Sequence, residues 1–140
     1  MTLMQIEEIR MDDYEEIYRL WSRTPGMGLN ESDSAINIAG FLLRNKGFSL
    51  CCRDNGRIVG TVLCGHDGRR GYIYHTAVDE AYRGHGIGRA LVSGSLEKLK
   101  AIGIAKCHLF VFADNEPGNA FWNRTGWIKR QDILVYSKNL

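Results

Sequence analysis

The chain has 140 residues, of which 44% are hydrophobic and 24% charged, and this composition is typical of a globular protein with one domain over residues 1–140. Its net charge of +2 is too small to favour nucleic acid as a partner. No apolar run has the length of a membrane span and the first residues lack a secretory signal, so we expect a cytoplasmic protein with no membrane partner.

The N-terminal part of the chain predicts one strand followed by two helices. Two helices separated by a loop form a candidate wall of a substrate cleft, with Trp21 as a candidate substrate contact. The alternative is that Trp21 simply covers the core. The predicted segments are a strand over 3–10, a helix capped by Asp12 or Asp13 that stops before Thr24, a loop over 25–30, and a helix from Ser32 or Asp33 to Asn45.

Three further strands are predicted over residues 48–53, 58–65 and 72–78. Asn55-Gly56 lies between the first two of these, and Asn-Gly between β-rich runs is a strong hairpin signal. The link over 66–71 is polar and predicts a second hairpin loop. This loop offers candidate substrate contacts, Asp67 for a cationic amine and Arg69 or Arg70 for a carboxylate or a coenzyme phosphate; the alternative is a solvated hairpin tip.

A glycine-rich loop joins the strand over 72–78 to a helix predicted over 86–101. A helix start leaves backbone N–H groups unpaired, and its partial positive charge favours an anion such as a phosphate. The loop does not fit the dinucleotide fingerprint in either register, and it lacks the Gly-Lys-Ser/Thr ending of a Walker loop. The candidate anion-binding residues are Arg83, Gly84, His85, Gly86, Ile87, Gly88 and Arg89.

A fifth strand is predicted over residues 106–112, parallel to the fourth and beside it, because a strand-helix-strand crossover is right-handed. Residues 127–138 then predict one or two terminal strands, in which Ile133, Val135 and Tyr136 are expected to pack on the sheet.

Two motifs resemble those of the GNAT superfamily of acyl-CoA-dependent N-acyltransferases. The first is Arg83-x-x-Gly86-x-Gly88, and the second contains Asn115, Phe121-Trp122 and Gly126-Trp127 in the family's order and spacing. The chain is similar to small bacterial members that carry Asp-Gly-x-Arg-Gly before the fourth strand. The resemblance implies a mixed α+β fold, with a six- to seven-stranded, mostly antiparallel sheet, a parallel and splayed pair formed by the fourth and fifth strands, and about four helices.

The resemblance also implies a site for acetyl-CoA and no metal. The coenzyme pyrophosphate is expected on the amides of residues 83–88, and the pantetheine arm along the strand edge at Ala77 and Val78, where the Val78 N–H is the candidate donor to the thioester oxygen. Asn115, Asn119 and Trp122 are the expected coenzyme contacts in the second motif. Trp122 stands where the family frequently has a tyrosine that protonates the departing thiolate; an indole N–H can donate a hydrogen bond without giving up its proton.

Strand alternation puts Tyr72, Tyr74 and Thr76 on one face and Ile73 and His75 on the other. Some family members carry histidines where the two tyrosines stand, so Tyr72 and Tyr74 are the candidate catalytic residues, together with Trp122, and Tyr72 also a substrate contact. His75 has the better intrinsic pKa for a base, but in this pattern its face is opposite that of Tyr74.

These observations predict an N-acetyltransferase that moves an acetyl group from acetyl-CoA to a primary amine by direct attack in a ternary complex. The amine would belong to a small molecule, a peptide N-terminus or a lysine, and the enzyme would be a monomer or a homodimer. The alternatives are a non-catalytic acyl-CoA-binding sensor or partner module, suggested by Trp122, and a nucleotide-binding fold, which the missing third glycine disfavours.

The four cysteines fall inside predicted strands without the spacing of metal ligands: Cys51, Cys52, Cys64 and Cys107. We interpret them as small, reduced core residues, which agrees with a cytoplasmic location.

Overall fold

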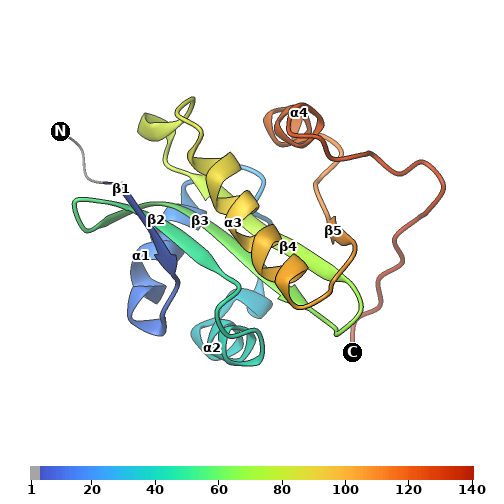
Figure 1. The fold of residues 1–140 in the computed structure, drawn as a ribbon, viewed down its shortest axis with the longest axis horizontal. Helices are drawn as coiled ribbons and strands as arrows, with labels where there is room; N and C mark the ends of the chain where they lie inside the picture. Colours follow the sequence, from blue (N-terminus) through green and yellow to red (C-terminus); the bar gives the residue numbers. More distant parts are fainter. Residues whose placement is uncertain (1–3) are drawn as a thin grey trace. The chain divides into compact units, whose positions relative to one another are not determined.

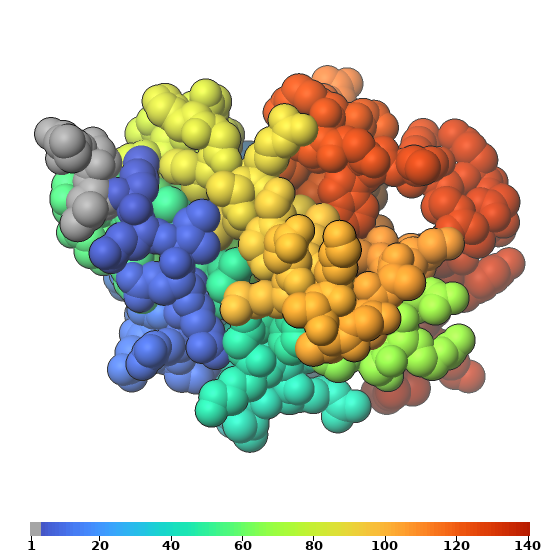
Figure 2. Space-filling model, in the orientation of Figure 1, coloured from blue at the N-terminus to red at the C-terminus, as the bar shows by residue number. Residues whose placement is uncertain are grey.

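The computed structural model describes residues 4–140 (Figures 1 and 2). These residues divide into two compact units, one up to Phe110 and one from Val111 onward. The single domain expected over 1–140 stays a prediction, and Leu3 of the expected first strand lies outside the described residues. The first unit contains β1 (Met4–Glu8), η1 (Met11–Asp13), α1 (Tyr14–Ser22), η2 (Glu31–Asp33), α2 (Ala35–Arg44), β2 (Leu50–Asp54), β3 (Arg57–His66), β4 (Gly71–Val78), η3 (Glu80–Tyr82), α3 (Ile87–Ala101) and β5 (Cys107–Leu109), and the second contains α4 (Glu116–Arg124).

The strands form one sheet in the order β1-β2-β3-β4-β5, with antiparallel pairs except for the parallel pair β4-β5. This confirms the mixed α+β class, the parallel fourth and fifth strands, and a helix count of four for the part of the chain described. The hairpin at Asn55-Gly56 is also confirmed, because both residues have positive φ (51° and 85°) as the tightest hairpin turns require.

The described residues provide five strands, fewer than the six or seven that were expected, because residues 127–140 form none. Ile133, Val135 and Tyr136 are 52%, 65% and 90% exposed. Their alternating pattern has the composition of a strand, but strand structure requires a hydrogen-bonded neighbour, and residues 4–140 provide no pairing partner for this segment.

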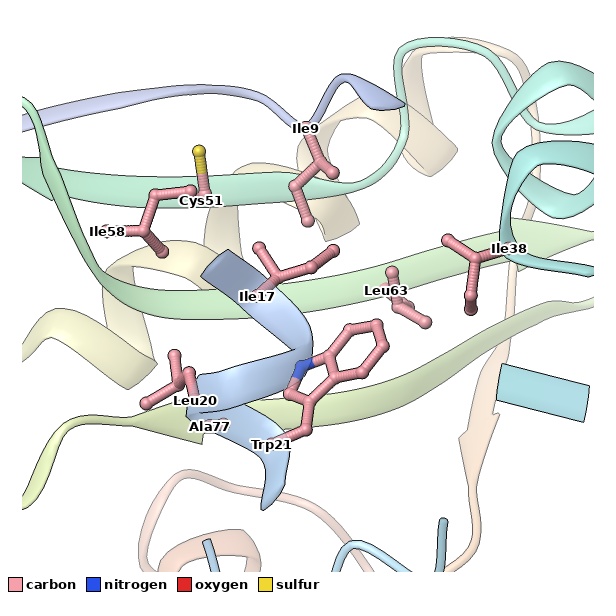
Figure 3. Packing of buried hydrophobic residues seen from close by; sticks show 9 residues of the cluster. All are labelled: Ile9, Ile17, Leu20, Trp21, Ile38, Cys51, Ile58, Leu63 and Ala77. Carbon is pink, nitrogen blue, oxygen red and sulfur yellow. The ribbon is translucent and has the colours of Figure 1, made fainter. Parts of the chain in front are cut away.

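One face of the sheet packs on α1 and α2, and Figure 3 shows the side chains that fill this layer. Trp21 is fully buried at its centre and donates from Nε1 to Thr61 Oγ1 over 3.0 Å. The structure therefore places Trp21 in the core and not where a substrate would meet it. The cluster consists of Ile9, Ile17, Leu20, Trp21, Ile38, Cys51, Ile58, Leu63 and Ala77.

The other face packs on α3, and two glycines allow the helix to lie close to the strands. A Cβ added at Gly60 would come within 3.0 Å of the Ile87 and Leu91 side chains, and one at Gly71 within 2.5 Å of Leu99. Any larger residue at these positions would push α3 away from the sheet. The close packing fixes α3 against β3 and β4, and η3 and the glycine loop connect the end of β4 to the helix N-terminus.

Candidate active site

A β-bulge in β4 sets the direction of the side chains around the candidate site. Leu63 of β3 pairs with Tyr74, and Thr61 pairs with Ala77, so that His75 and Thr76 stand opposite Val62 alone. His75 has φ 39°, which is uncommon for a residue other than glycine. A bulge adds one residue to a strand and interrupts its two-residue alternation.

The bulge places His75 on the same face as Tyr74, and the expectation that they face opposite sides is wrong. The Tyr74 ring lies 5.9 Å from that of Phe41 in α2, and the His75 ring lies 4.7 Å from that of Trp21 in α1. Since α1 and α2 contribute to one core cluster, both rings lie on this side of the sheet.

Tyr72 and Tyr74 form a stacked pair on this face, with ring centroids 6.3 Å apart and planes inclined by 18°. Tyr74 is 36% exposed, and its burial raises the pKa of its hydroxyl, with a further rise from Tyr72. The Tyr74 hydroxyl therefore stays protonated at neutral pH, where it can donate or accept a hydrogen bond but cannot act as an anionic base.

The parallel strands β4 and β5 stay paired for only three residues. Cys107–Leu109 pair with Gly71, Tyr72 and Ile73, and from Tyr74 onward this edge of β4 has no partner strand among residues 4–140. The expected splayed pair is thus confirmed in the first unit. The parting of the strands leaves backbone donors and acceptors of β4 available along this edge.

The Val78 N–H points toward the open edge. The Asp79 N–H donates to the Val59 carbonyl on β3 over 2.8 Å, and Gly60 pairs with Val78 one step further along. In an antiparallel ladder, hydrogen-bonded and non-hydrogen-bonded pairs alternate, so the Gly60–Val78 pair does not exchange hydrogen bonds. The Val78 amide is therefore directed away from β3.

Asp79 holds the end of β4 through three contacts. Its Oδ1 accepts from the Ala81 N–H at the start of η3, and its Oδ2 accepts from Arg23 (2.9 Å) and Arg57 (3.1 Å). The hydrogen bond from Arg23, followed by that from Ala81, lowers the pKa of the Asp79 carboxyl. Its ionised side chain therefore ties α1 and β3 to the turn that leads into the glycine loop.

The glycine loop leads into α3 without a side-chain cap. Gly84 and Gly86 have φ of 81° and 79°, and Gly86 is the N-cap residue of the helix. The first bond within the helix runs from the Ala90 N–H to the Gly86 carbonyl, so the amides of the first turn have no partner in the helix. Arg83 lies beside them and donates from Nε to the Val78 carbonyl over 3.0 Å.

The hairpin loop between β3 and β4 is closed by Asp67. Its Oδ1 accepts from the Arg69 and Arg70 N–H groups, both at 2.8 Å, and these bonds, that from Arg70 first, lower the pKa of the exposed carboxyl. One carboxylate oxygen is therefore used by the turn itself. Substrate binding by Asp67, Arg69 and Arg70 stays a prediction.

The second unit begins with a well-capped helix. Asn115 Oδ1 accepts from the Gly118 N–H at the start of α4, and Asn119 Nδ2 donates to the Phe112 and Asn115 carbonyls. Trp122 packs edge-on against Phe121 and Trp127, at 4.8 and 5.3 Å between ring centroids. These hydrogen bonds give both asparagines a structural role in α4. The expected coenzyme contacts of Asn115, Asn119 and Trp122 and the expected catalytic role of Trp122 stay predictions.

All four cysteines are free, as expected. Within residues 4–140 no group of three His, Cys, Asp or Glu side chains is arranged to hold a metal ion. No helix in this part of the chain combines the length and apolar character needed to span a membrane.

Comparison with known proteins places the chain in a family. Residues 8–127 match the model of the acetyltransferase (GNAT) family. An acetyltransferase of Sodalis glossinidius is 32% identical over 137 residues, which cover 98% of this chain and 96% of that protein, and an acetyltransferase of Pectobacterium atrosepticum is 38% identical over 113 residues, covering 81% and 79%. The chain therefore belongs to the GNAT family, and it is an acyl-CoA-dependent acetyltransferase.

The fold is shared with solved structures of lower identity. The Ard1 protein of Thermoplasma volcanium superimposes with a TM-score of 0.78 at 23% identity, over 89% of this chain and 82% of that one. The PaiA N-acetyltransferase of Thermoplasma acidophilum, solved in complex with coenzyme A, gives the same TM-score at 17% identity, over 89% of each chain.

Proposed function

We propose that this acetyltransferase moves an acetyl group from acetyl-CoA to a primary amine by direct attack in a ternary complex. The observation that carries the proposal is the Val78 N–H, which is directed toward the unpaired edge of β4. This amide lies just before a loop whose following helix starts with uncapped N–H groups.

The residues of the first unit fit the coenzyme. The uncapped amides at the start of α3 suit a diphosphate, because a helix N-terminus combines free donors with partial positive charge. Arg83, exposed beside them, can add a charge-assisted hydrogen bond. The open edge that ends at Val78 suits the amides of a pantetheine arm, which can pair with an edge as a peptide strand does, whereas the Ala77 N–H and carbonyl are turned toward β3 in this register.

Bound acetyl-CoA would supply an acyl group activated as a thioester. The Val78 N–H would donate to the thioester oxygen, where negative charge grows as the amine attacks. Tyr72 and Tyr74 would orient the amine or an ordered water, since both rings lie on one face of β4. The amine must be neutral to attack, and an alkylammonium with a pKa of about 10.4 must first lose a proton.

The test compares Gly86→Glu with Gly56→Glu by calorimetry of acetyl-CoA binding. Both glycines have positive φ and open space around a new Cβ, so the two variants share the strain and the added charge. We expect Gly86→Glu to weaken binding at least about tenfold, because its carboxylate repels the diphosphate, and Gly56→Glu to bind normally. Equal affinities in the two variants would contradict the proposed coenzyme site.

Turnover is measured by release of free thiol from acetyl-CoA with a panel of polyamines, amino acids and peptides. We expect wild-type protein to release thiol with at least one amine. Tight binding of acetyl-CoA with no release on any amine would select the non-catalytic sensor instead.

A further inference from the structure

A histidine and an aspartate from distant segments meet beside the two tyrosines. His75 Nε2 lies 2.6 Å from Asp33 Oδ1, and the side chains are 16% and 7% exposed. His75 belongs to the bulge of β4 and Asp33 to η2, in the link between α1 and α2. The pair therefore joins the loop between the two helices to the strand that carries Tyr72 and Tyr74.

Asp33 is held both at its carboxylate and at its main chain. Its Oδ2 accepts from the Asn30 N–H over 3.1 Å, and the Asp33 carbonyl accepts from the Tyr14 hydroxyl over 2.7 Å. The Asn30 N–H thus orients the carboxylate, Tyr14 of α1 holds the main chain of Asp33, and Oδ1 is left for the imidazole.

His75 has contacts at both its ring and its main chain. Its ring meets the Trp21 ring edge-on, and the His75 carbonyl accepts from Thr61 Oγ1 over 3.1 Å. The groups around it that can titrate are Asp33 from η2, Tyr14 from α1, which reaches it through Asp33, and Tyr74, its neighbour in β4. Asp33 is the group in direct contact with the ring.

The hydrogen bond to Asp33 defines the tautomer of the neutral ring. An ionised carboxylate only accepts, so Nε2 carries the proton and Nδ1 carries the lone pair. Among residues 4–140, the buried side-chain nitrogen and oxygen atoms without a partner are Asp54 Oδ1 and Thr76 Oγ1. His75 Nδ1 is not one of them and has no hydrogen-bond partner in this part of the chain, so this atom keeps some contact with solvent.

We propose that Asp33 and His75 form a proton-accepting pair that deprotonates the acceptor amine, directly or through one water. The proposal rests on the proposed amine acetylation. The ammonium gives its proton to His75 Nδ1, and Asp33 stabilises the imidazolium that forms. The neutral amine then forms the C–N bond, the C–S bond breaks, and the thiolate takes up the proton that the attacking nitrogen releases.

The strained backbone agrees with this assignment. A residue at φ 39° is costly unless the surrounding structure requires it, and such residues gather at functional sites. A regular β4 would direct His75 away from Tyr74, so the bulge is the feature that gives the imidazole access to this face.

The main test compares two acceptor amines in wild-type protein and in His75→Gln. One acceptor is an alkylamine that is protonated at neutral pH, and the other is a weakly basic amine that is already neutral. We expect His75→Gln to lower kcat/KM about 100-fold for the alkylamine, the usual range for a general base, and far less for the weakly basic amine. Equal losses for the two amines would overturn the proposal, because a merely structural histidine would not distinguish them.

Asp33→Asn gives a second readout. This variant keeps the imidazole and removes the carboxylate that stabilises the imidazolium, so we expect it to lower kcat/KM for the alkylamine far more than for the weakly basic amine. His66→Gln is the control and should change neither value. Equal losses for the two amines in folded Asp33→Asn would contradict the role of the pair.

Two controls separate this proposal from the one on which it rests. Acetyl-CoA affinity, measured by calorimetry, should be unchanged in His75→Gln, and a wild-type protein that acetylates no amine would refute the proposed function before the pair is tested. If His75→Gln does not fold, Asp33→Asn decides, and equal losses of kcat/KM for the two amines in that variant would overturn the proposal.

Discussion

At the scale of single residues, the Asp79 carboxylate stabilises the turn between β4 and the glycine loop. Its Oδ2 takes hydrogen bonds from Arg23 and Arg57, and its side chain is only 10% exposed, although the arginines are 49% and 59% exposed. We predict that Asp79→Asn lowers the free energy of unfolding by about 1–2 kcal/mol at neutral pH, since hydrogen bonds to a charged group are lost and the exposed arginines are partly screened.

The effect of Asp79→Asn should depend on pH. The pKa of the folded Asp79 carboxyl is lowered, chiefly by Arg23, so its contribution is present above the unfolded pKa of about 3.9 and is lost as pH falls through the folded value. Urea unfolding of both proteins should therefore show a difference that shrinks in acid. Asp132→Asn, at a side chain 68% exposed, is the control with little expected effect; a difference for Asp79→Asn that is independent of pH would contradict the prediction.

At the scale of elements, the start of α3 depends on the backbone conformation of Gly86. Its φ of 79° is left-handed, and a Cβ there would meet no atom within 4 Å, so only the backbone opposes substitution. We predict that Gly86→Ala lowers the free energy of unfolding by about 1 kcal/mol. Gly40→Ala, in the open middle of α2, is the matched control and should raise it by about 0.5–1 kcal/mol.

Thermal or urea unfolding of the two glycine variants measures this contrast. The substitutions are chemically identical, both sites are sterically open, and they differ in backbone conformation. Changes of the same sign in both variants would contradict the assignment of Gly86 to a left-handed helix cap.

At the scale of the whole molecule, the four free thiols report on unfolding. Burial raises the pKa of Cys51 and Cys64 to about 12 and of Cys107 to about 11, and it also raises that of Cys52. Thiol reagents attack the thiolate, so we predict slow labelling of the native protein at mildly alkaline pH, with Cys107 first, and rapid labelling of all four thiols in denaturant.

Mass spectrometry of the labelled protein counts the modified thiols. The melting temperature should not change on addition of a reductant, because the thiols are free. Rapid labelling of Cys51 or Cys64 in native protein would indicate that the core around β2 and β3 opens far more easily than its burial implies.

The elements and the family could be predicted because their signals are local. Asn55-Gly56 defines a hairpin through its own positive φ values, and the glycines between Arg83 and Gly88 define a helix start in the same way. The order of β2, β3, β4 and β5 follows from two short hairpin links and one right-handed crossover. These features can be predicted without knowing which distant residues are in contact.

The surroundings of His75, the candidate base, could not be predicted, because they depend on how β3 and β4 pair and on contacts between distant segments. Alternation along β4 puts His75 and Tyr74 on opposite faces, and only the register with β3 reveals the bulge. Asp33 was recognisable as a helix-start residue, but its contact with a histidine 42 positions away has no local signal. The prediction of terminal strands within residues 127–140 was wrong, because the pattern of this segment is typical of strands but a strand forms only beside a hydrogen-bonded partner.

The sequence by itself determined which strands and α-helices the first unit contains, the glycine loop and the membership of an acetyltransferase family, because local backbone preferences and spacing carry that information. Tertiary structure decided the face on which His75 lies, the burial of Trp21 and the direction of the Val78 amide. These depend on strand register and on packing between distant segments, where one inserted residue redirects every side chain that follows it.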